Sequence, residues 1–193
     1  MSTDTASVEL VGEEAAGNIA RAALLAAMTG AFAYVSFPNP FSPAPVSLQV
    51  LGVFLAGILL GPVWGGVSMA LYLLTGAVGA PVFAGGSAGI GALFGPTGGY
   101  LWSYPVSAFV IGAIVHGGLG LKNPIPRGIP RLVGAMVVGT VVIYAFGVVG
   151  FAVVLDMTLT KAFLTAAAAF IPAEAFKMVA AIGVVRSDQI TAE

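Results

Sequence analysis

Glu174 and Lys177 are two opposite charges three residues apart in the apolar stretch FIPAEAFKMVAA, residues 170–181. Side chains at i and i+3 lie on the same face of a helix, so these two can be neighbours. A charge in a membrane helix is costly and normally faces a cavity or a charged partner. A carboxylate accepts hydrogen bonds and an ammonium group donates them, so the pair suits a polar ligand. An ion pair that only fixes helix packing is the alternative, and the spacing allows both.

The pair stands out because the chain is poor in charge. Hydrophobic residues make up 59% of its 193 residues and charged residues only 8%, whereas about a quarter of the residues of a soluble domain are charged. Several apolar runs reach the roughly 17–25 residues that a helix needs to cross a bilayer. The sequence therefore predicts an all-α, multi-pass membrane protein. Its net charge of −1 gives no sign of nucleic-acid binding, and the lack of cysteine excludes disulfides and thiolate chemistry.

Apolar runs separated by proline and glycine predict six transmembrane helices in one bundle. The runs cover residues 18–37, 46–60, 62–79, about 100–119, about 132–155, and Pro172 to about Val185, with TLTKAFLTAAAAF at 158–170 before the last helix. Gly61-Pro62 separates the second helix from the third, because proline suits a first helical position. Residues 1–17, which carry acidic and no basic side chains, are predicted to form a tail outside the bilayer. Residues 18–193 then form the single transmembrane domain.

The distribution of lysine and arginine predicts the orientation, because cytoplasmic loops carry an excess of these residues. With the N-terminus inside, the outer connections hold only Lys161. The inner set is then Arg21, Lys122, Arg127, Arg131 and Arg186. Six helices with both termini in the cytoplasm fit this bias.

The stretch APVFAGGSAGIGALFGPTGG at 80–99 is predicted to be a glycine-rich outer loop between the third and fourth helices. Seven of its twenty residues are glycine, which permits unusual backbone angles and close approach to a ligand. Four large side chains are too apolar for a solvated loop: Phe83, Ile90, Leu93 and Phe94. We therefore expect a cap over the mouth of the bundle, with a flexible external loop as the alternative.

Catalytic and metal-binding patterns find little support. The only histidine is His116, beside Gly117 and Gly118, and a single histidine is more often a packing residue than a ligand. No glycine of the 80–99 loop is followed by the GK[ST] of a phosphate-binding loop, and no such motif occurs elsewhere. We therefore expect neither enzyme activity nor a metal or cofactor.

Small residues recur at intervals of four on the first predicted helix. The pairs are Ala22 with Ala26, Ala23 with Ala27, and Ala26 with Gly30. Such spacing allows another helix to approach closely. Packing within the bundle and docking of a partner subunit both fit the pattern.

Residues 43–101 resemble the BioY family of biotin transporter subunits. The stretch is PAPVSLQVLGVFLAGILLGPVWGGVSMALYLLTGAVGAPVFAGGSAGIGALFGPTGGYL, and the similarity continues more loosely to the last helix. The resemblance implies a six-helix subunit of the cytoplasmic membrane that binds biotin near its outer face. It also implies assembly with a transmembrane coupling protein and two cytoplasmic ATPases, as the S component of an energy-coupling-factor (ECF) transporter.

The resemblance also implies site residues. The family pattern Pro-x-Asp-x-x-Lys falls on Pro172, Glu174 and Lys177, with Glu174 in place of the usual Asp. Matching positions add the ligand contacts Gln49, Phe83, Ser87, Gly89 and Tyr100. Partner docking is implied for Ala22, Ala23, Ala26 and Ala27. Trp102 and Tyr104 fit either the core or an interfacial aromatic belt.

Two other functions remain open at this point. The same architecture would serve an S component or a stand-alone carrier for a different small vitamin, with only the pocket lining changed. A membrane enzyme that uses Glu174 as general base is the other alternative. It is less suitable, because the cation at Lys177 stabilises the carboxylate and weakens it as a base.

Overall fold

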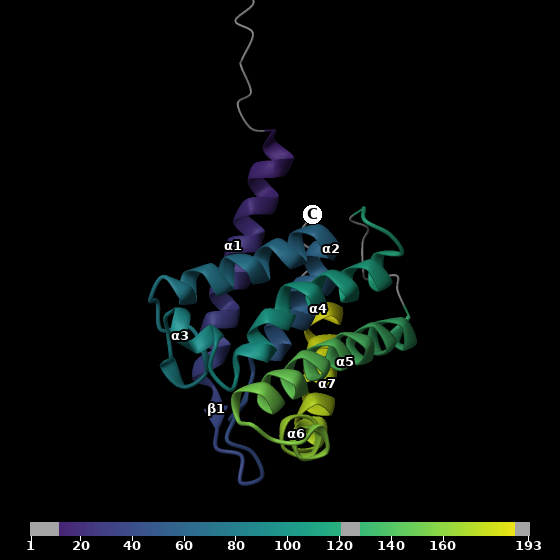
Figure 1. The fold of residues 1–193 in the computed structure, drawn as a ribbon. Helices are drawn as coiled ribbons and strands as arrows, with labels where there is room; N and C mark the ends of the chain where they lie inside the picture. Colours follow the sequence, from purple (N-terminus) through teal and green to yellow (C-terminus); the bar gives the residue numbers. More distant parts are fainter. Residues whose placement is uncertain (1–11, 121–127, 188–193) are drawn as a thin grey trace, which may run out of the picture.

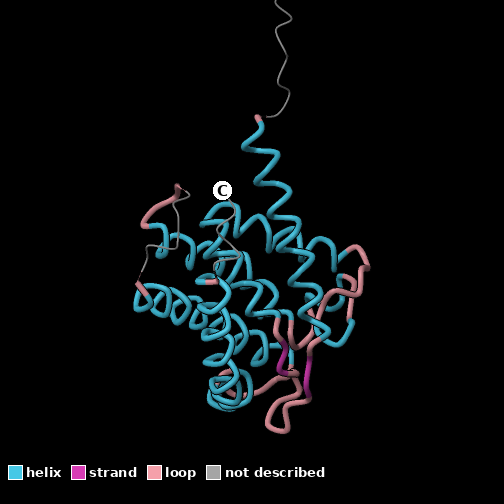
Figure 2. The backbone as a smooth tube through the Cα atoms, turned by 180° about the vertical axis from the view of Figure 1, so that it is seen from behind, coloured by secondary structure: helices cyan, strands magenta, loops and turns pink. Residues whose placement is uncertain are grey.

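The computed structural model describes residues 12–120 and 128–187. Helices account for most of this part of the chain, and each strand has only two residues (Figure 2). The elements are α1 (Glu13–Tyr34), β1 (Ser36–Phe37), β2 (Val46–Ser47), α2 (Gln49–Ala77), η1 (Ala84–Gly86), α3 (Ile90–Leu93), α4 (Gly98–His116), α5 (Ile129–Val154), α6 (Leu159–Ala166), η2 (Ala168–Phe170) and α7 (Ile171–Arg186).

Within the described residues, five helical stretches are long and apolar enough to cross a membrane. They are Glu14–Tyr34, Gln49–Ala77, Gly98–His116, Ile129–Val154 and Leu159–Arg186. The predicted all-α membrane architecture is thus confirmed. Figure 1 shows that α1 begins and α7 ends on one side of the molecule, while β1 and α6 lie on the opposite side.

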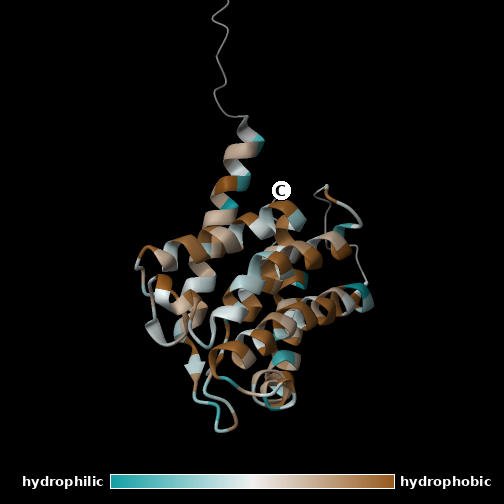
Figure 3. Cartoon of the chain, viewed as in Figure 1, coloured by the Kyte–Doolittle hydropathy of each residue, from teal (hydrophilic) through white to brown (hydrophobic). Residues whose placement is uncertain are grey.

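Helix α5 is helical because of its apolar surroundings and not because of the intrinsic preference of its residues. It is rich in valine, which in water favours strands. In hydrocarbon, however, a lone segment satisfies its backbone N–H and C=O groups only as a helix. Several of its valines lie at the surface, with Val141 62% and Val153 76% exposed, and hydrophobic residues make up most of α5 (Figure 3). Pro130 lies in the first turn, where no intrahelical N–H is needed.

Helix α2 is broken at Gly61, as the sequence predicts. Gly61 has φ 72° and ψ −174°, a conformation open to glycine, and the two halves of α2 run in different directions (Figure 1). Pro62 has no N–H to offer the carbonyl of Ile58. Nε2 of the buried His116 lies 2.9 Å from that carbonyl oxygen, and a carbonyl only accepts, so the ring N–H donates. The histidine for which the sequence suggested no role thus completes the hydrogen bonding of the break.

Glycines let α4 pack directly on this break. A Cβ on Gly112 of α4 would lie 2.7 Å from Cα of Pro62, and a Cβ on Gly57 would lie 2.6 Å from the carbonyl oxygen of Ala108. Both separations are too short for carbon in contact, so these positions accept no side chain. Backbone-to-backbone contact of this kind is typical of membrane helix pairs.

Two segments differ from the sequence-based expectations. Within 80–99, Phe83 and Leu93 are buried as expected of a cap, whereas Ile90 and Phe94 are 63% and 69% exposed. The proline-rich connection at 38–45 is the turn of a small hairpin, in which Ser36 pairs with Ser47 in antiparallel register. Strands of two residues are too short to leave a periodic signal in the sequence.

The two ends of the chain and one connection are only partly described. Helix α1 begins at Glu13, within the predicted tail 1–17, of which residues 1–11 lie outside the described residues. Lys122 and Arg127 of the predicted inner set also lie outside them. The last three predicted helices correspond to α4, α5 and α7. Each of them begins and ends within three residues of its predicted limits.

We predict that Gly112→Ala destabilises the protein by about 1–3 kcal/mol, because the added methyl group must separate α4 from the break in α2. Gly134→Ala is the matched control, since nothing lies within 4 Å of a Cβ there. Thermal unfolding of the two variants in the same detergent measures the difference. Equal melting temperatures would contradict the close backbone contact between α2 and α4.

Candidate functional site

The buried ion pair of α7 is the chemical centre of the site. Lys177 Nζ lies 2.6 Å from Glu174 Oε1, and both side chains are 5% exposed. Pro172 lies in the first turn of α7, so the helix starts just before Glu174. The carboxylate therefore sits at the helix N-terminus, where the backbone dipole favours negative charge. The predicted neighbours are confirmed as a pair.

A second polar group comes from the start of α2. Ser47 Oγ donates to Gln49 Oε1 at 2.7 Å, and Gln49 Nε2 donates to the hydroxyl of Tyr72. Tyr72 in turn donates to the carbonyl of Val82 at 2.9 Å. This chain of hydrogen bonds fixes the orientation of the buried Gln49 amide and joins both halves of α2 to the glycine-rich loop.

Aromatic rings form the remaining walls. Phe83 is 1% exposed and contacts Tyr72 edge to face, with ring centroids 5.5 Å apart. It packs against Gly76, where any side chain would meet its ring. The Tyr100 hydroxyl donates to the carbonyl of Ala166, which ties α4 to α6, and its ring lies 6.3 Å from that of Phe170. Edge and offset contacts of this kind stabilise aromatic clusters.

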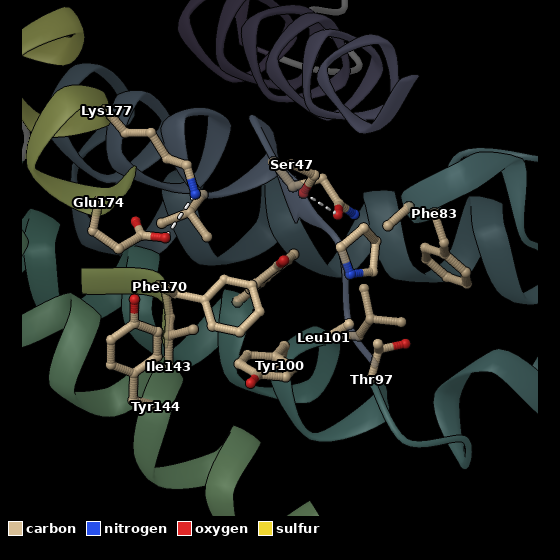
Figure 4. Close-up of a pocket in the computed structure, with 16 residues that line it drawn as sticks. Ser47, Phe83, Thr97, Tyr100, Leu101, Ile143, Tyr144, Phe170, Glu174 and Lys177 are labelled. Atoms are coloured by element: carbon tan, nitrogen blue, oxygen red, sulfur yellow. Dashed lines mark hydrogen bonds and ion pairs between the residues drawn. The ribbon is translucent and has the colours of Figure 1, made fainter. Parts of the chain in front are cut away.

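These groups surround one small cavity of about 50 Å³. Figure 4 shows the ion pair on one side of it, Phe83 and Thr97 on the other, and the ring of Phe170 between them. Its lining comes from α2, α4, α5, α7 and the segments before α2, α4 and α7: Ala44, Pro45, Ser47, Gln49, Val50, Phe83, Ala84, Thr97, Tyr100, Leu101, Tyr104, Ile143, Tyr144, Phe170, Glu174 and Lys177. The space holds a few water molecules, so a larger organic ligand must displace side chains.

The structure brings most of the predicted ligand contacts together. Five of the seven line the cavity: Gln49, Phe83, Tyr100, Glu174 and Lys177. Ser87 and Gly89 do not line it. Ser87 is exposed, and its hydroxyl donates to the carbonyl of Ala84 at 3.0 Å. The N–H of Gly89 donates to the carbonyl of Gly76 at 2.7 Å. These two residues shape the loop that carries Phe83.

Sequence reasoning missed several lining residues. Tyr144 and Ile143 of α5 and Phe170 before α7 lie in apolar runs that give no sign of which face is buried. Tyr104, which fitted either the core or an interfacial belt, lies in the lining and is 4% exposed, whereas Trp102 is 47% exposed.

Two polar atoms of the lining have no protein partner. Glu174 Oε2 and the hydroxyl of Tyr144 are both buried and make no hydrogen bond in the described structure. The carboxylate oxygen accepts and the hydroxyl can donate as well as accept, so a ligand with both a donor and an acceptor can satisfy them. Among the described residues, no group of three or more His, Asp or Glu side chains is arranged to hold a metal ion.

The four alanines of α1 that are expected to dock a partner point in different directions. Ala22 and Ala26 are buried inside the chain, 0% and 8% exposed, and Ser68 of α2 donates to the carbonyl of Ala22 at 2.8 Å. Their smallness serves internal packing, so the expectation that they contact a partner needs correction. Ala23 and Ala27 are exposed and remain available for docking.

Comparison with known proteins gives consistent results. The BioY family model matches residues 3–191. The chain is 38% identical to the biotin transporter BioY of Rhizobium etli over 73% of its own length and 75% of that protein. It is 37% identical to the biotin transporter BioY of Rhodobacter capsulatus, over 69% and 68% of the two lengths.

A solved structure shares the fold. It is the crystal structure of the S-component for biotin from an ECF-type ABC transporter, with a TM-score of 0.82, 24% identity, and coverage of 91% of this chain and 92% of that one. The family model spans nearly the whole sequence, including α7 with its ion pair. The chain therefore belongs to the BioY family.

Proposed function

We propose that this chain binds biotin and carries it across the cytoplasmic membrane as the substrate-binding S component of an ECF-type transporter. The observation that carries the proposal is the buried Glu174–Lys177 pair in a pocket with aromatic walls, in a chain of the BioY family. Relatives named as biotin transporters support the ligand.

The pocket suits the chemistry of biotin. Biotin has two ureido N–H donors, a ureido carbonyl, an apolar fused ring and a chain that ends in a carboxylate. The unpartnered Glu174 Oε2 can accept a ureido N–H, and the ammonium of Lys177 can bind the carboxylate or the carbonyl. Aromatic walls such as Phe83, Tyr100 and Phe170 suit the fused ring.

Capture requires the pocket to open, because its free volume is only about 50 Å³. The glycine-rich loop is the natural moving part, since Phe83 belongs to it and lines the cavity. We infer that biotin enters from outside while this loop is displaced, and that the loop then closes over it. In the proposed topology the two halves of α2 count separately, which gives six crossings with both termini in the cytoplasm.

Release into the cell requires energy from partners. We propose a transmembrane coupling protein and two cytoplasmic ATPases, whose ATP hydrolysis drives reorientation of this chain. The exposed face of α1 around Ala23 and Ala27 is the proposed contact with the coupling protein, because small side chains allow a second helix to approach closely.

We expect the purified chain to bind biotin at micromolar concentration or below, measured by isothermal titration calorimetry in detergent. The double variant Glu174→Gln/Lys177→Met removes both charges without leaving one buried and unpaired, a change that would itself be destabilising. Its affinity for biotin should fall by at least about a hundredfold, because two charge-assisted hydrogen bonds are lost.

Lys161→Met is the control, since this lysine of α6 is exposed and outside the pocket. It should bind biotin like the unmodified chain. If the folded, monodisperse double variant also bound normally, the pair would be structural only. No binding of biotin by the unmodified chain would exclude biotin as the ligand.

For partner docking, we expect Ala23→Trp to prevent co-purification with the coupling protein, because the indole ring holds the helices apart. Ala180→Trp places the same ring on the exposed surface of α7 and should leave the complex intact. Both variants should still bind biotin. Full recovery of the complex with Ala23→Trp would remove this face of α1 from the interface.

A further inference from the structure

A second cavity lies between α5 and the α6–α7 region. It has a volume of about 760 Å³, far larger than the biotin pocket. Its walls are almost entirely apolar, with Val141 and Val149 from α5 and Ile171 and Met178 from α7. Several of its residues are more than half exposed, among them Val141, Val149 and Ile171, so the groove opens on the outer surface of the helices, which faces hydrocarbon.

Tyr144 and Glu174 line both cavities and therefore form the partition between them. The hydroxyl of Tyr144 is buried and unpartnered, and so is Glu174 Oε2. In Figure 4 the Tyr144 side chain points its hydroxyl toward the side of the pocket that holds Glu174. An unpaired donor and an unpaired acceptor thus lie at the same boundary.

The partner of the Tyr144 hydroxyl must come from the pocket. On the groove side, the walls offer hydrocarbon and the hydroxyl of Thr140, which is itself buried without a partner. A hydroxyl left unpaired in such surroundings costs free energy. On the pocket side, Lys177 donates one of its N–H groups to Glu174 Oε1, whereas the buried Tyr144 hydroxyl has no partner among the described residues.

We propose that Tyr144 is a specificity-determining residue, whose hydroxyl donates to the ureido carbonyl of the ligand while Glu174 Oε2 accepts the adjacent ureido N–H. The assignment rests on the proposed biotin function. A cyclic urea presents N–H and C=O side by side on one edge, which matches the neighbouring acceptor and donor. A ligand with two acceptors on that edge would face the carboxylate unfavourably, so the arrangement selects ureas and amides over carboxylates.

The test compares two ligands with three forms of the full-length chain by titration calorimetry. The ligands are biotin and 2-thiobiotin, in which sulfur replaces the ureido oxygen and is the weaker acceptor. Tyr144→Phe keeps the ring and removes only the hydroxyl; it should bind biotin about tenfold more weakly, as expected for one buried hydrogen bond. It should also lose most of the preference for biotin over 2-thiobiotin.

Thr140→Val is the matched control, because it removes the other unpartnered hydroxyl of α5, which lines the groove only. It should keep both the affinity and the preference. Tyr144→Phe binding biotin like the unmodified chain would overturn the assignment while leaving the proposed function intact. An equal loss for both ligands, or an equal loss in Thr140→Val, would also overturn it. Failure of the unmodified chain to bind biotin would overturn the proposed function and the assignment together.

Discussion

Hydrocarbon offers no hydrogen-bond partners, and this constraint accounts for much of the structure. It makes a helix of the valine-rich α5, although valine favours strands in water. It also limits how α2 can be broken: where Pro62 provides no N–H, the carbonyl of Ile58 needs another donor, and His116 supplies one from α4. The absence of a side chain at Gly112 brings α4 close enough for that contact. The break at Gly61 and Pro62, the close contact at Gly112 and the hydrogen bond from His116 therefore depend on one another.

The same lack of hydrogen-bond partners explains why the buried charges of the pocket indicate a ligand site. Burying Glu174 and Lys177 together is at best weakly stabilising, because both charges lose their hydration. A well-packed apolar pair would serve helix packing as well. The pair instead leaves Glu174 Oε2 unsatisfied beside the equally unsatisfied Tyr144 hydroxyl. A site that is incomplete by itself and completed by a ligand explains both the charges and the unpaired atoms, and so links the energetics of the bilayer to selective binding.

The sequence predicted the features that depend on residues close together in the chain. Pro172 predicts the start of α7 and therefore the place of Glu174 in its first turn, and the i, i+3 spacing predicts the contact with Lys177. Gly61 and Pro62 predict the break in α2. Tyr144 and Phe170 escaped prediction, because in an apolar run every face looks suitable for burial and the periodicity that marks a core in soluble proteins is missing.

The sequence by itself determined that the chain is a multi-pass helical membrane protein, where its helices break, and which two charges pair. Only the tertiary structure decided which side chains meet from distant segments, such as Gln49 with Tyr72 or Tyr144 with the wall of α7. It also decided that Ala22 and Ala26 face inward while Ala23 and Ala27 face outward. Spacing gives the relative angle of residues on a helix, but the rotation of that helix depends on its neighbours, here α2, whose Ser68 donates to the carbonyl of Ala22.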